Sequence, residues 1–186
     1  MIGYAMCGSF CTFGDSYESL SILKKTYTDI QPIMSYNAYN TDTRFGKCEE
    51  WIKRIEDICE RPIINTIYDA EPLGPKVSLD ALVIAPCTGN TLAKLASGIT
   101  DTPVCMAAKA HLRSDRPLLV ALASNDAMSA NLGNIGKLLN RKNVYFVPMK
   151  QDDPIKKPHS LVADFKLIPE SLEMALNDQQ KRKLFL

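Results

Sequence analysis

The 186-residue sequence predicts a three-layer α/β fold, in which a mostly parallel sheet is covered on both sides by helices. Short apolar runs alternate with longer segments that carry apolar residues at helical spacing, which is the order expected of such a fold. Two of the runs, DALVIA at 80–85 and LLVALA at 118–123, are apolar at nearly every position. Strands of this kind are buried on both faces, as the strands of parallel sheets are.

In the first sixty residues the alternation occurs twice. Residues 2–7 form a short apolar run, and 13–26 follow with a helical stripe of apolar side chains. Residues 30–36 predict a second strand, in which Pro32 indicates an edge strand or a strand start. Residues 46–59 predict an amphipathic helix, because apolar residues recur at helical spacing and opposite charges stand four residues apart.

Beyond residue 80 the same pattern continues. We expect strands at 80–85, 118–123 and 144–148, and helices at 90–97, 103–112 and 127–139. After these, 150–158 is a polar loop, 160–177 is helical with a break before Pro169, and the basic tail 179–186 is frayed. We find neither a repeat nor a linker. Residues 1–186 are therefore expected to form a single domain, with 150–186 as a C-terminal loop and helical extension.

Composition and charge exclude several classes of protein. The 22 Lys and Arg residues against 21 Asp and Glu residues leave a net charge of +1, which provides no broad basic field for nucleic acid or a membrane surface. No apolar run is long enough to span a membrane, and no basic segment precedes the first apolar run as in a signal peptide. We therefore expect a cytoplasmic protein.

The cysteines and histidines predict no metal site. The six cysteines include no C-x-x-C pair, and only two histidines are present. Structural zinc sites need such ligand spacings. An even cysteine count also allows disulfides, but a chain of this length with this much core does not need them. We expect free thiols.

Three strand-end loops carry small polar residues where a parallel sheet binds its ligands. The first loop contains Gly8, Ser9 and Phe10 ahead of a predicted helix, and a helix N-terminus favours a phosphate. This loop matches neither GxGxxG nor the lysine-containing P-loop, so a P-loop NTPase is not expected. An ordinary β–α turn is the alternative interpretation.

The second and third loops favour a mononucleotide. Ser35 ends the second strand at the place where NAD-binding folds have an acidic residue for the ribose, and a hydroxyl suits a phosphate better. In the third loop, Thr88 and Thr91 can donate to a phosphate or a ring carbonyl, although Thr88 could instead serve only as a helix cap. Periodicity and spacing thus predict a nucleotide-binding protein with a flavodoxin-like or Rossmann-like fold.

Several of these motifs resemble the homo-oligomeric flavin-containing Cys decarboxylase superfamily. Residues 80–101 are similar to its P-A-S-A-N-T or P-C-S-x-x-T block, and 132–135 are similar to its L-x-N-M helix. The resemblance covers residues 1–150 and implies FMN as cofactor in a single flavoprotein domain. The cofactor-binding residues that it implies are Gly8, Ser9, Phe10, Ser35, Cys87, Thr88, Gly89, Asn90, Thr91, Arg116, Ser124 and Asn125.

Within that superfamily, three segments resemble flavoproteins that take part in dipicolinate formation during sporulation. These segments are 85–104, 124–139 and 156–165. The resemblance implies a dehydrogenase-like partner protein, a small dicarboxylate substrate and oxidation of a dihydrodipicolinate precursor. It also implies homo-oligomers, either trimers or dodecamers, in the cytoplasm of the mother cell of a spore-forming bacterium.

The sequence also departs from the decarboxylases. No histidine lies in 61–69, and Ala-Ser-Asn-Asp-Ala-Met at 123–128 replaces their P-x-M-N-x-x-M motif. These departures argue against decarboxylation of a peptidyl cysteine, which stays an alternative to the oxidative function. A non-catalytic scaffold for the partner protein is a second alternative. The Arg-Glu pair of the prenyl-FMN synthases is absent from 123–128 as well, which argues against prenyl transfer.

The catalytic residue is not identified by the sequence, and two residues are candidates. Asn125 follows a buried strand beside Asp126 and could hydrogen-bond flavin or substrate, although Asp126 also suits a helix N-cap. His159 follows two lysines, and such a cluster would bind a dicarboxylate, although a solvated loop explains the same residues. His111 is interpreted as a surface histidine near a helix end.

Overall fold

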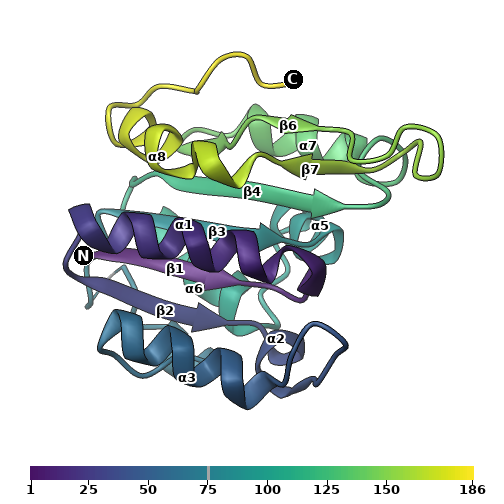
Figure 1. Cartoon of the computed structure of the whole chain (residues 1–186). Coiled ribbons are helices and arrows are strands. Elements are labelled where there is room, and N and C mark those ends of the chain that lie inside the picture. Colours follow the sequence, from purple (N-terminus) through teal and green to yellow (C-terminus); the bar gives the residue numbers. More distant parts are fainter. Residues whose placement is uncertain (75) are drawn as a thin grey trace.

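The computed structural model describes residues 1–74 and 76–186, and in this part of the chain a seven-stranded sheet lies between two layers of helices (Figure 1). The order is β2-β1-β3-β4-β7-β6, and β5 pairs with β4 outside this path. All pairings are parallel except β4 with β7 and β6 with β7. The predicted three-layer, mostly parallel fold is thus confirmed. The strands are β1 (Ile2–Met6), β2 (Ile30–Met34), β3 (Ala81–Cys87), β4 (Leu118–Ser124), β5 (Val144–Phe146), β6 (Met149–Lys150) and β7 (Leu161–Ala163).

The helices divide between the two faces of the sheet, and each face has its own hydrophobic cluster. Helices α1, α3 and α8 cover one face, whereas α4, α5, α6 and α7 cover the other. Their bounds are α1 (Phe13–Thr26), α2 (Tyr36–Asn40), α3 (Cys48–Cys59), α4 (Ile67–Ala70), α5 (Gly89–Ser97), α6 (Pro103–Leu112), α7 (Leu132–Leu139) and α8 (Ile168–Leu176), with 3-10 turns η1 (Phe10–Thr12) and η2 (Phe165–Leu167).

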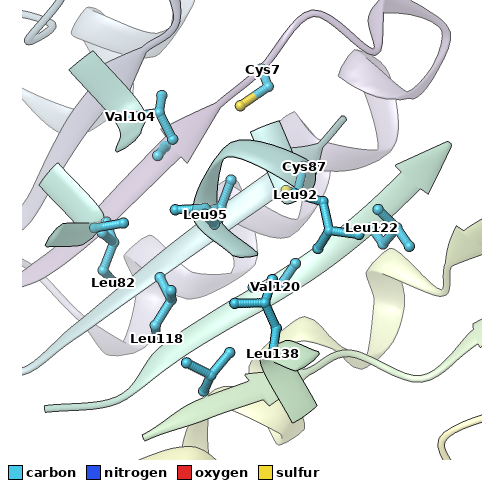
Figure 2. Packing of buried hydrophobic residues seen from close by; sticks show 14 of the residues in the cluster. Cys7, Leu82, Cys87, Leu92, Leu95, Val104, Leu118, Val120, Leu122 and Leu138 are labelled. Atoms are coloured by element: carbon cyan, nitrogen blue, oxygen red, sulfur yellow. The ribbon is translucent and has the colours of Figure 1, made fainter. Parts of the chain in front are cut away.

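Successive side chains along a strand point to opposite faces of the sheet, so a single strand contributes residues to both clusters. In β4, Leu118, Val120 and Leu122 point to one face, whereas Leu119 and Ala121 belong to the cluster on the other. Figure 2 shows the first set gathered around side chains of α5 and α7. Full burial of one such side chain contributes about 1.5–3 kcal/mol, so these apolar strands fix the positions of the loops that follow them.

The N-terminal predictions agree with the structure. Helix α1 has the predicted bounds, and α3 begins two residues later than expected. Pro32 lies in β2, which is at one end of the strand order, as an edge strand should be. The predicted second strand stops at Met34, because Ser35 caps the short helix α2. Neither α2 nor α4 was predicted.

Three C-terminal predictions are wrong. The expected helix at 127–139 begins only at Leu132, because Ser129 and Asn131 bond through their amides to the Asp126 carbonyl in a turn. Part of the expected helix at 160–177 is strand β7, which pairs with β4. The tail 179–186 is docked rather than frayed, since Phe185 forms a bridge with Met149.

Two further sequence expectations can be compared with the structure. No helix in the described ranges is long and apolar enough to cross a membrane. All six cysteines are free thiols, and four of them are buried.

Candidate functional site

A polar cavity of about 360 Å³ lies where β1, β2 and β3 end. The arrowheads of these strands point to the same edge of the sheet in Figure 1. Cavities of this size hold small ligands, and this edge is where open α/β sheets bind them. The lining residues are Gly8, Ser35, Tyr36, Asn37, Thr88, Asn90, Thr91, Lys94, Asp101 and Thr102.

The third strand-end loop supplies hydroxyl groups and a helix N-terminus to the cavity. Thr88 is the N-cap of α5, and its Oγ1 accepts a bond of 3.3 Å from the Thr91 amide. Thr91 Oγ1 lies 3.1 Å from Thr88 Oγ1 and donates to Cys7 Sγ at 3.3 Å. Capping and lining the cavity are therefore compatible roles, because one hydroxyl orients the helix end that faces the cavity.

Ser35 and Gly8 shape the opposite wall. The Ser35 amide donates to the Met6 carbonyl at 3.0 Å, which ties the end of β2 to the end of β1. Its hydroxyl accepts from the Ala38 amide at 3.3 Å. A Cβ at Gly8 would lie 3.4 Å from the Phe10 ring and 3.5 Å from Asn37 Cβ, which are ordinary contact distances.

A second helix N-terminus and an ion pair complete the lining. Thr102 caps α6, and its Oγ1 accepts from the Cys105 amide at 3.2 Å. Lys94 Nζ lies 2.8 and 3.0 Å from the two carboxylate oxygens of Asp101. This bond from Lys94 lowers the pKa of Asp101. The cavity thus contains one cation and one anion that neutralise each other.

Lys94, Asp101 and Thr102 were not among the predicted site residues. A signal for Lys94 was present in the sequence, because it stands three residues after Thr91 and therefore lies on the same face of α5. Asp101 carries no such signal. It reaches Lys94 only because Gly98 ends α5 in the left-handed conformation, at φ 72°, and turns the chain back.

The end of β4 holds a separate polar cluster, which consists of Ser124, Asp126 and Asn131. Asp126 Oδ1 accepts from Ser124 Oγ at 2.5 Å and from Asn131 Nδ2 at 3.0 Å, and the first of these bonds lowers the pKa of Asp126. A Cβ at Gly89 would lie 2.8 Å from Asp126 Oδ1 and closer still to Ser124 Oγ. Gly89 therefore allows α5 to pack closely against this cluster, where a side chain would not fit.

Cys87 does not line the cavity. It is fully buried at the end of β3, and burial raises its pKa well above the usual value for a thiol. Cys7 is also buried, which raises its pKa to about 12. Because the thiolate is the reactive form, neither cysteine is arranged as a nucleophile.

Arg116 lies away from the cavity. It precedes β4, so it is at the amino ends of the strands, whereas the cavity is at their carboxyl ends. Its Nη1 donates to the Leu79 carbonyl at 2.8 Å and to Asp80 Oδ1 at 3.1 Å. Asp80 also binds the amino group of Met1 at 2.7 Å. Within one chain, Arg116 therefore ties the N-terminus to the sheet.

Four other predicted residues do not line the cavity. Ser9 and Phe10 form the turn into η1 and are half-buried. Asn125 and His159 are both exposed, and the His159 carbonyl accepts from the Met128 amide at 2.9 Å. That bond places the loop between β6 and β7 next to the turn that follows β4.

The interpretation of His111 as a surface residue is wrong. The side chain is fully buried, with Nε2 2.9 Å from the Pro117 carbonyl and Nδ1 without a partner in the described structure. Burial lowers its pKa. The sequence pattern near the end of α6 did not reveal that β4 and the preceding loop would cover this helix end.

The residues that line the cavity fit the phosphate and sugar-like parts of a flavin nucleotide. They offer neutral hydroxyl and amide groups, two helix N-termini and a lysine, which is the donor set that phosphates bind. Gly8 contributes backbone without a side chain to this lining. No group of three or more metal-binding side chains lies in the described residues.

The chain belongs to the flavoprotein family, whose model matches residues 2–166. It is 43% identical over 185 residues to the B subunit of dipicolinate synthase from Bacillus subtilis (strain 168), and the match covers 100% of this chain and 92% of that protein. The crystal structure of the B subunit of dipicolinate synthase from Bacillus halodurans C matches with a TM-score of 0.91 and 42% identity, over 100% and 95% of the two chains. These findings confirm the resemblance that the sequence motifs indicated.

A more distant likeness is to the FMN-dependent cysteine decarboxylase SpaF. The TM-score is 0.70 at 22% identity, and the match covers 95% of this chain and 94% of the other. At this identity the two chains share a fold.

Proposed function

We propose that this chain is the FMN-binding B subunit of a dipicolinate synthase. With the dehydrogenase-like partner protein of that synthase, it oxidises a dihydrodipicolinate precursor to dipicolinic acid during sporulation. The observation that carries the proposal is the polar cavity at the carboxyl ends of β1, β2 and β3. The full-length similarity to a dipicolinate synthase component supports the reaction class.

The residues of the chain would bind and orient the cofactor. The side chains of Ser35, Thr88 and Thr91 and the N-termini of α5 and α6 line one cavity. Forming a pyridine from a dihydropyridine removes two electrons and two protons, and FMN supplies a two-electron acceptor when it is bound. Cys87 and Cys7 are buried thiols, which gives no support to covalent chemistry at this site.

The dicarboxylate substrate is proposed to approach from the β6–β7 loop. Lys156 and His159 are exposed in that loop, which contacts the turn after β4 through the bond between Met128 and His159. Asn125 lies exposed in the same turn. Together these side chains offer cationic and amide donors for carboxylates. We also propose that the chain forms homo-oligomers, either trimers or dodecamers, and that it acts in the cytoplasm of the mother cell.

Trp51 provides a direct test of cofactor binding, because it is the single tryptophan of the chain. The Trp51 and Phe13 rings meet edge-on with their centroids 5.5 Å apart. The Phe13 ring centroid in turn lies 5.2 Å from that of Phe10, in the first strand-end loop. We expect added FMN to quench Trp51 fluorescence with saturation at one FMN per chain and to give a bound-flavin absorption spectrum. Absence of quenching and of a bound spectrum would contradict the cofactor assignment.

A matched pair of variants locates the binding site. Thr88→Val removes a hydroxyl that lines the cavity, and we expect FMN to bind about tenfold or more weakly, since a hydrogen bond to a charged group contributes roughly 1.5–3 kcal/mol. Thr26→Val changes an exposed threonine at the far end of α1 and should leave FMN affinity unchanged. Equal affinities in the two variants would place the flavin elsewhere.

The reaction is tested by reconstitution with the dehydrogenase-like partner protein. We expect dipicolinate formation from the precursor to depend on this chain and on FMN. If the chain stimulates the partner equally without FMN, it is a scaffold. Release of CO2 from cysteinyl peptides would instead favour a decarboxylase.

A further inference from the structure

We propose that Lys94 makes the cavity selective for a phosphorylated flavin over an unphosphorylated one, and that Asp101 positions the lysine for this role. The inference rests on the proposed function, because it concerns what the same cavity recognises. It adds a specificity-determining residue that the sequence motifs did not single out.

The placement of Lys94 supports the proposal. Lys94 and Asp101 are the charged residues among the ten that line the cavity, and the other polar side chains in the lining are neutral hydroxyls and amides. Neutral donors can bind a sugar chain and a phosphate alike. A full cation adds a strong Coulomb attraction to a phosphate, which a ligand without phosphate lacks.

The ion pair between Lys94 and Asp101 holds the lysine without blocking it. The Lys94 side chain is 21% exposed, so its stem is largely covered, whereas Asp101 is 58% exposed. Two short bonds to Asp101 keep the ammonium at the cavity, and a lysine has three donors to share. Solvent screens the exposed carboxylate, which allows a phosphate dianion to compete for the same ammonium.

The helix ends alone do not make this distinction as strongly. The N-termini of α5 and α6 each carry about half a positive charge, and Asp101 lies two residues before α6, where its carboxylate offsets part of that field. With Lys94 neutralised by Asp101, the lining has no formal net charge until a phosphate draws on the ammonium. Removing the lysine would leave Asp101 as an unpaired anion facing the phosphate.

The experiment compares FMN with riboflavin in Trp51 fluorescence titrations. We expect Lys94→Met to weaken FMN binding roughly 10- to 100-fold, the range for a bond between charged groups, and to change riboflavin binding by less than about twofold. Lys94→Arg should keep most of the preference for FMN, because the charge remains. Lys53→Met is the matched control, since Lys53 also pairs with an acid, Asp57 at 3.1 Å, on the surface of α3.

The outcomes separate this inference from the proposed function. Equal losses for FMN and riboflavin in Lys94→Met, or an unchanged ratio of their affinities, would overturn the role of Lys94 while leaving flavin binding intact. A wild-type chain that binds neither ligand overturns both proposals. Should Lys94→Met fail to fold, as judged by circular dichroism, Lys94→Gln in the same titrations decides the matter.

Discussion

The side-chain amide of Gln180 pairs with the backbone of Phe146 through two hydrogen bonds. The Phe146 amide donates to Gln180 Oε1 at 2.9 Å, and Gln180 Nε2 donates to the Phe146 carbonyl at 2.6 Å. One side chain thus satisfies both polar groups of a residue in β5, as a neighbouring strand would. The bonds anchor the tail at the start of the segment that ends in the Phe185–Met149 bridge.

Gln180→Leu should destabilise the protein by about 1–3 kcal/mol, because a buried donor and acceptor in β5 lose their partners. Urea unfolding measures this loss. Gln179→Leu is the control, since Gln179 is exposed, and it should change the free energy of unfolding by less than about 0.5 kcal/mol. Equal effects of the two substitutions would show that the bonds between Gln180 and Phe146 contribute nothing to stability.

Gly89→Ala should be destabilising even though alanine favours helices. A Cβ there would lie 2.7 Å from Asn131 Nδ2 and 2.8 Å from Asp126 Oδ1, so the polar cluster at the end of β4 must move. Overpacking of this kind costs about 1–3 kcal/mol. We expect the loss in urea unfolding, together with weaker FMN binding, because the N-terminus of α5 shifts with residue 89.

A matched glycine-to-alanine substitution in α7 should change the free energy of unfolding in the opposite direction. Gly136 lies in the interior of that helix with no atom within 4 Å of an added Cβ. Gly136→Ala should therefore stabilise the protein by about 0.5–1 kcal/mol through the reduced entropy of the unfolded chain. If both variants are destabilised alike, the distinction between a packed and an open glycine is wrong.

The parts of the fold that the sequence predicted are those with strong local patterns. Helices α1 and α6 have their predicted bounds, because the apolar spacing and the flanking residues act within a few residues. Strand β7 was missed because three residues carry little periodicity, and its strand conformation depends on pairing with β4. The docked tail was missed for the same reason, since Gln180 finds its partner 34 residues away.

The candidate site was predicted where polar residues directly follow strands. Gly8, Ser35, Thr88, Asn90 and Thr91 all line the cavity, because the carboxyl ends of parallel strands converge. Arg116 was placed by motif similarity alone, and the structure locates it at the opposite ends of the strands. Because Arg116 precedes the strand predicted at 118–123, its position in the sequence already indicated the amino end of that strand.

Ser16 connects α1 to the strand that leads into the cavity. Its hydroxyl donates to the Ala85 carbonyl at 2.5 Å, and the Tyr4 hydroxyl donates to the Ser16 carbonyl at 2.9 Å. Ser16→Ala leaves the buried Ala85 carbonyl without this partner and should cost about 1–3 kcal/mol in urea unfolding. Ser97→Ala, at an exposed position, should change little, and a similar loss there would contradict the assignment.

His111 makes stability depend on pH. Burial lowers its pKa below the ordinary value of 6.5, an effect that the neighbouring Arg116 adds to. The bond to the Pro117 carbonyl and the Asp80 carboxylate oppose the shift without cancelling it. Below pH 6.5 the unfolded chain therefore binds a proton that the folded chain does not, whereas above it both states are neutral and the residue has no effect.

The free energy of unfolding should consequently fall as the pH drops below 6.5, with a contribution from His111 of up to about 1.4 kcal/mol per pH unit until the folded pKa is reached. Urea unfolding between pH 5 and 8 measures this slope. His111→Gln removes the titrating group and should flatten this pH profile. The glutamine amide can still donate to the Pro117 carbonyl, so the bond at this position is kept. His159→Gln changes an exposed histidine and should leave the pH dependence of the free energy of unfolding unchanged. If the slope persists in His111→Gln and disappears in His159→Gln, the buried histidine is not its source.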